Sequence, residues 1–138
     1  MSCVCFSSPR GAVLDGVHPA LLQLFYPSRG HFIGVIGSLS QRSLVRSVKT
    51  AMKGVTPLPV YSFSGPRFIP GVDFSDHINF WNEGYPAVMI TDTAFHRNLN
   101  YHHLDDTANE LEYDRMAMVV VGVFEAVRDL AGEDAVSP

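Results

Sequence analysis

Two short segments carry most of the side chains that could do chemistry. The first is Ser75-Asp76-His77, and the second begins at Thr91-Asp92-Thr93 and continues through the adjacent residues His102 and His103. Four of the six histidines and the only tryptophan lie between residues 75 and 107. Imidazole and carboxylate groups bind zinc and transfer protons. The spacing therefore favours a metal site or acid–base chemistry, whereas serine hydrolysis is not expected because no Gly-x-Ser-x-Gly segment is present.

Short apolar runs bounded by glycine or proline predict the strands that position these side chains. Such runs are typical of buried strands in α/β proteins. The polar stretch from Thr91 to Asn109 follows the carboxyl end of the last predicted strand, at 87–91. Open α/β sheets bind ligands at the edge formed by the carboxyl ends of their strands. We therefore expect function at this edge. The predicted strands cover residues 2–6, 32–36, 58–63 and 87–91.

Apolar residues at helical spacing predict three helices, one after each of the last three strands. The first is expected to run from Ser40, as N-cap, to Gly54, and the last to end at Gly132. The middle helix, within 73–83, is expected to point Phe80 and Trp81 inward. For the last helix, the apolar stripe expected to face the core comprises Met116, Val119, Val120, Val123, Phe124, Val127 and Leu130.

The alternation of strands and helices predicts the fold class. We expect an α/β three-layer sandwich with a mostly parallel central sheet flanked by helices. Residues 1–132 are expected to form one domain and residues 133–138 a flexible tail.

Composition excludes several classes of partner. The formal net charge is -4 and the basic residues do not cluster, so nucleic acid is not an expected ligand. The longest apolar run, at 116–124, is shorter than the roughly 20 residues that a membrane helix needs. The first residues lack the features of a signal peptide, which leaves the cytoplasm as the default compartment.

Five motifs in one order resemble a known enzyme family. They are Ser-Asp-His before an aromatic pair, Gly-Tyr-Pro-Ala entering a strand, Thr-Asp-Thr leaving it, Asn-x-Asn-Tyr-His, and Asp-Thr before the final helix. Together they resemble the C-terminal part of the family-twenty-eight zinc metallopeptidases, which include bacterial aminopeptidases and, more distantly, glutaminyl cyclases. The resemblance extends loosely from about residue 21 and tightly from residue 71 onward.

The resemblance implies a zinc exopeptidase that removes N-terminal residues from peptides, on a partial aminopeptidase-like fold. It makes His102 the zinc ligand, and it places Asp76, Asp92 and Tyr101 beside the ligands or in the substrate pocket. Structural roles stay open for the same residues. Ser75 or Asp76 could cap a helix, and Asp92 could tie down Arg97 or a turn. Asp105 and Asp106 could equally cap a helix or brace a loop.

The chain departs from the family in most of the zinc site. The family's His-x-Asp and Glu-Glu segments lie before the matched region, and this chain has neither there, so only His102 can be carried over and the general base is absent. Zinc belongs to the complete family site, and stable binding by this chain alone is not expected. We expect a C-terminal portion that acts on peptides only when an N-terminal half completes it. The alternative is a non-catalytic interaction module on the same scaffold.

A partial sheet also predicts association. Strands that the missing half would cover present unpaired backbone groups, which are templates for pairing. We expect self-association or partner binding at the exposed sheet edge nearest the N-terminus, formed by residues 2–6.

Overall fold

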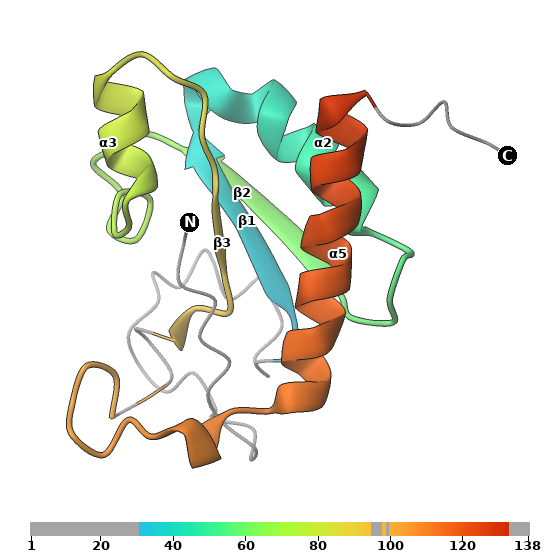
Figure 1. The fold of residues 1–138 in the computed structure, drawn as a ribbon. Coiled ribbons are helices and arrows are strands. Elements are labelled where there is room, and N and C mark those ends of the chain that lie inside the picture. The colour runs from blue at the N-terminus through green and yellow to red at the C-terminus, as the bar shows by residue number, and fades with distance from the viewer. Residues whose placement is uncertain (1–30, 95–97, 99, 133–138) are drawn as a thin grey trace, which may run out of the picture.

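The computed structural model describes residues 31–94, 98 and 100–132 (Figure 1). The predicted strand at 2–6, Arg97 and the predicted tail at 133–138 lie outside the described residues. Short 3-10 turns, η1 (Leu39–Gln41) and η2 (Ala108–Glu110), precede two of the helices. The strands and helices are β1 (Ile33–Ser38), α2 (Arg42–Met52), β2 (Val60–Gly65), α3 (His77–Asn82), β3 (Met89–Thr91) and α5 (Tyr113–Ala131).

The described strands form a mixed sheet in the order β2-β1-β3. Strand β1 pairs in parallel with β2, with Ile33 opposite Val60, and antiparallel with β3, with Gly34 opposite Thr91. The α/β class is confirmed, but a mostly parallel sheet is not, because one of the two pairings is antiparallel. A parallel β3 would need a crossover that returns the chain along the whole sheet. The connection instead places α3 beside the end of the sheet where β1 and β2 finish, so β3 begins there and runs back along β1 (Figure 1).

Helices α2 and α5 pack against each other and share one apolar core with the sheet (Figure 1). Ile33 and Val35 alternate toward this core from β1, as the period of a strand requires. At the α2–α5 contact, a Cβ added at Gly122 would lie 3.3 Å from Cε of Met52, so the missing side chain permits a close approach. The other buried members of this core are Val45, Val48, Met52, Leu58, Val60, Val119 and Ala126.

The buried face of α5 agrees with the predicted stripe only in part, since Val119 is buried and Val123 packs against the core. Val119, Gly122 and Ala126 are its buried residues, whereas Val120 and Phe124 of the predicted stripe are exposed. The predicted stripe included only large apolar side chains and left out glycine and alanine. Small residues allow helix backbones to approach closely, and here they form the face toward α2.

The ends of the helices follow the sequence only in part. Gly54 and Gly132 have φ values of 91° and 74°, so the predicted C-terminal glycines are confirmed. Ser40 is not the N-cap of α2. It lies within η1, and its hydroxyl is 2.8 Å from the hydroxyl of Ser38. Across the described part of the chain, no helix combines the length and the apolar character needed to cross a membrane.

Candidate functional site

The Thr91-Asp92-Thr93 segment forms a tight turn as β3 ends. Asp92 is buried, and its Oδ1 accepts a hydrogen bond of 2.9 Å from the backbone N–H of Ala94. The backbone N–H of Thr93 donates to Oγ1 of Thr91, also at 2.9 Å. These short-range bonds hold Thr93 at a φ of 66°, in the left-handed region. The described contact of Asp92 therefore supports a backbone turn, one of the two roles that the sequence left open.

This turn lies at an edge of the sheet that the sequence did not predict. Because β3 is antiparallel to β1, its last residue pairs near the start of β1. The expectation of a site at the carboxyl ends of parallel strands therefore fails for this loop. At the same edge, Arg115 forms an ion pair of 2.9 Å with Glu112 and contacts the ring of His31. These contacts join His31, two residues before β1, to the start of α5.

Beyond the turn, Asn98 and Asp106 close the loop that carries the two adjacent histidines. The side-chain amide of Asn98 donates to Oδ1 of Asp106 at 2.8 Å, and Oδ1 of Asn98 accepts from the backbone N–H of Asn100 at 2.9 Å. The second oxygen of Asp106 accepts from the backbone N–H of His102 at 3.3 Å. Both oxygens of Asp106 thus brace the loop, which was one of the alternatives for this residue.

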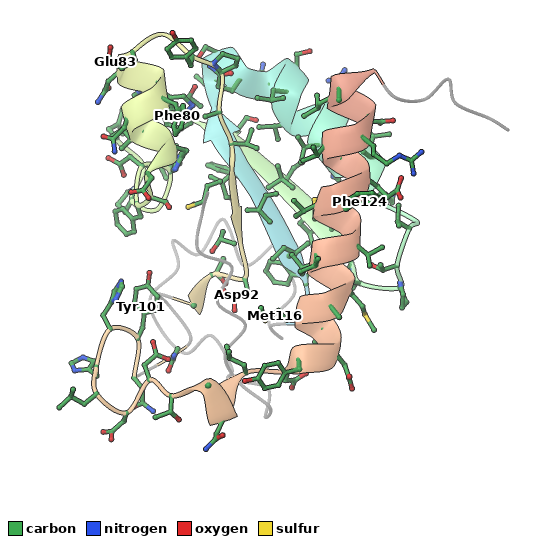
Figure 2. All side chains as sticks on the ribbon, viewed as in Figure 1. Phe80, Glu83, Asp92, Tyr101, Met116 and Phe124 are labelled. Atoms are coloured by element: carbon green, nitrogen blue, oxygen red, sulfur yellow. The ribbon has the colours of Figure 1, made fainter. Side chains whose placement is uncertain are left out.

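The loop presents the imidazole of His102 at the surface. His102 is exposed and has a φ of 62°, and its ring centroid is 4.1 Å from that of the half-buried Tyr101. A left-handed φ is uncommon for a residue with a Cβ and is retained only where the surroundings fix it. Here the hydrogen bond that the backbone N–H of His102 donates to Asp106 and the contact with the ring of Tyr101 hold this conformation. Figure 2 shows Asp92 where β3 ends and Tyr101 on a loop that extends away from the sheet.

The Ser-Asp-His segment has a different role. His77 is buried, and its Nε2 lies 2.7 Å from the carbonyl oxygen of Val72, while Nδ1 is buried with no hydrogen-bond partner among the described residues. Its ring meets that of Trp81 edge-on at 4.5 Å between centroids, and Trp81 donates to the carbonyl of Ala87 at 2.9 Å. His77 therefore anchors α3 to the preceding loop.

Two expectations about α3 are wrong. Asp76 is exposed and occupies the N-cap position, yet its side chain makes no capping hydrogen bond. Its φ of -57° and ψ of -18° are already helical, whereas a capping residue needs extended backbone. Phe80 is exposed, because only Trp81 of the aromatic pair turns inward.

The predicted site residues do not gather into one metal centre within the described residues. No group of three or more His, Cys, Asp or Glu side chains in that part of the chain is arranged to hold a metal ion. The structure adds Asn98, to which the sequence assigned no role. Its signal was present in the Asn98-Leu99-Asn100 spacing, since asparagine side chains commonly bond the backbone two residues on.

Comparison with known proteins gives one informative match. No family model matches the chain, and no solved structure matches it. The chain is 53% identical over 106 residues to YfbL, an uncharacterized protein of Escherichia coli strain K12. The match covers 77% of this chain but 32% of YfbL. The chain thus spans about a third of the length of the curated relative that it matches.

Proposed function

We propose that the chain is the C-terminal portion of a zinc-dependent exopeptidase domain and that His102 is its contribution to the metal site. The observation that supports this role is the braced loop. Asp106 bonds the backbone of His102, and Asn98 bonds Asp106, so the imidazole projects from a fixed backbone. A metal ligand needs such support from groups around it, because an imidazole on a mobile loop loses entropy on binding.

The described residues do not form a zinc site by themselves. A catalytic zinc site takes three protein ligands and an open position. His103 is adjacent to His102, and Asp106 uses both carboxylate oxygens within the loop. The remaining ligands and the general base must therefore come from sequence outside the described residues. When bound there, zinc would supply the activated water for peptide hydrolysis.

The proposed domain is a three-layer sandwich in which further elements cover the second face of the sheet. Helices α2 and α5 share a core with the first face. The second face carries apolar and aromatic side chains, among them Phe32, whose ring meets Tyr61 edge-on at 5.2 Å between centroids. An apolar face of this kind is usual in sheets with helices on both sides.

Complementation by the longer relative tests the proposal. The part of YfbL that this chain does not match would be expressed separately, and zinc binding would be measured by calorimetry for each piece and for the mixture. We expect tight binding only in the mixture, together with release of an aminoacyl chromophore that a chelator abolishes. His102→Ala should remove both signals.

A matched control separates a ligand from a loop residue. His103 is also exposed and follows directly in the chain, so His103→Ala changes the same loop without removing the proposed ligand. We expect zinc binding by the mixture to survive this change. If the two pieces associate but bind no zinc, or if both alanine variants behave alike, the proposal is wrong.

A non-catalytic interaction module is the second candidate. It is favoured by the lack of a group of three metal-binding side chains within the described residues. In that case the mixture would neither bind zinc tightly nor hydrolyse the chromogenic substrate, although the chain would still fold and associate. The same titration therefore distinguishes the two candidates.

A further inference from the structure

Helix α5 has a second apolar stripe that no described element covers. Its residues repeat at alternating intervals of four and three, the spacing of the core positions in a coiled coil. All of them are exposed, and Phe124 at the centre is 59% exposed. The stripe consists of Tyr113, Ala117, Val120, Phe124, Val127 and Ala131.

The stripe lies opposite the face that packs on α2. Val119, Gly122 and Ala126 are buried, and the stripe residues fall on the other side of the helix. Figure 1 shows α5 in front of α2, so that its viewer-facing side meets no other described element, and Figure 2 labels Phe124 on it. Val121 and Leu130, which flank the stripe, are exposed as well. A contiguous exposed apolar surface of this kind marks a site of protein association.

The charges that flank the stripe identify its occupant. Asp114 lies one residue after Tyr113 at the start of the helix, and Arg128, which also pairs with Glu125 of its own helix at 3.1 Å, lies one residue after Val127 near its end. If the stripe residues are the a and d positions of a heptad, Asp114 and Arg128 both occupy position e. In an antiparallel helix pair, the e positions of one helix face the e positions of the other. With Val121 at the two-fold axis, Asp114 of each copy faces Arg128 of the other. In a parallel pair the same two residues would be about 21 Å apart along the axis.

We propose that two copies of this chain associate through an antiparallel pair of α5 helices. The stripes pack together, with Phe124 against Val120 of the second copy, and two Asp114–Arg128 pairs fix the register. A two-fold contact of this type is self-complementary and closes at the dimer. One helix of 19 residues from each copy makes a small interface, so association is expected in the micromolar range. This inference is independent of the proposed peptidase role.

Sedimentation equilibrium of the full chain across the micromolar range tests the proposal. We expect a reversible monomer–dimer equilibrium, and Phe124→Glu should raise the dimer Kd by at least about tenfold, because it places a charge at the centre of the apolar contact. Phe68→Glu is the matched control. Phe68 is 85% exposed and lies outside α5, so its replacement should leave the Kd unchanged.

Charge reversal tests the register. Asp114→Arg and Arg128→Asp should each weaken the dimer, and the double variant should restore it. Each reversal also opposes the helix dipole, so thermal unfolding of each variant is measured alongside. The double variant carries both unfavourable dipole terms, and its recovery can therefore come only from the contact between copies.

Three results would overturn the proposal. The chain could stay monomeric at all concentrations. The stripe would then be a contact surface for additional sequence of the kind that the longer relative carries. Association could persist in Phe124→Glu, which would move the contact to a sheet edge. The double reversal could fail to recover although both single variants are folded, which would exclude the antiparallel register.

Discussion

The core between the sheet and the helices differs from the loop at 98–107 in the interactions that hold each in place. In the core, Ile33 and Val35 are fully buried against α2 and α5, and the contacts join residues far apart in sequence. In the loop, Asn98, Asp106 and the backbone of His102 bond one another within a span of nine residues. Buried area stabilises the first region, whereas a few polar bonds at the surface shape the second.

The two regions therefore differ in role: the core stabilises the fold, and the loop positions His102. Burial of apolar side chains contributes about 1.5–3 kcal/mol each, so the core dominates the free energy of folding. A single exposed hydrogen bond contributes about 1 kcal/mol or less. Changes in the loop should therefore alter where His102 sits without unfolding the domain, and changes in the core should do the reverse.

The largest expected effect comes from Ile33→Ala. Ile33 has no exposed surface and lies at the centre of the core, so the change leaves a cavity as well as removing apolar contact. We expect a loss of about 2–5 kcal/mol in the free energy of unfolding, measured by urea denaturation. The half-buried Ile36 on the same strand is the control, and Ile36→Ala should cost clearly less. Equal losses would show that the two faces of the sheet are equally packed.

Overpacking at Gly37 should have the next largest effect. A Cβ at this position would lie 2.5 Å from Cγ2 of Val45, far inside van der Waals contact. We expect Gly37→Ala to destabilise the domain by about 1–3 kcal/mol, because β1 and α2 must move apart. Gly34→Ala is the matched control on the same strand, since its nearest neighbour would be 3.4 Å away. A larger loss at Gly34 than at Gly37 would contradict this packing of α2 on β1.

The sequence was sufficient to predict the strands and helix ends where short apolar runs are bounded by glycine or proline. Strands β1 and β2 and the glycine ends of α2 and α5 follow from local patterns and backbone chemistry. The antiparallel direction of β3 was missed, since strand direction depends on the connection rather than on the strand itself. The buried face of α5 was predicted only in part, because Gly122 and Ala126 carry no strong hydrophobic signal.

Asp92→Ala tests the boundary between the two regions. The residue is buried like the core, yet its described contact is a polar bond to the backbone of Ala94. Removing the carboxylate leaves that buried N–H without its acceptor, which should cost about 1–2 kcal/mol. Asp92→Asn keeps an oxygen at the same place and should cost less. If both variants lose the same stability, the bond to Ala94 is not what matters at Asp92.

The candidate site was predictable only in its residue types. His102, Tyr101 and Asp106 belong to motifs that stand out in the sequence, but the sequence could not specify which groups bond to each other. Asp76 was predicted to act through its side chain, and the structure leaves that side chain without a capping bond. Polar partners within a loop depend on backbone angles such as the φ of 62° at His102, which no apolar pattern encodes.

The smallest effect on stability, and the most local one, is expected from Asp106→Ala. The side chain is exposed and touches only the loop, so the free energy of unfolding should change by about 0.5 kcal/mol or less. The bonds to Asn98 and to the backbone of His102 are both lost, however, and the left-handed conformation of His102 loses one of its two described supports. Hydrogen exchange in the loop should therefore become faster while exchange in β1 stays unchanged.

Asp105→Ala is the matched control, because no side-chain bond to its carboxylate contributes to the described brace. Faster exchange in both variants would mean that negative charge, rather than the two hydrogen bonds of Asp106, orders the loop that presents His102.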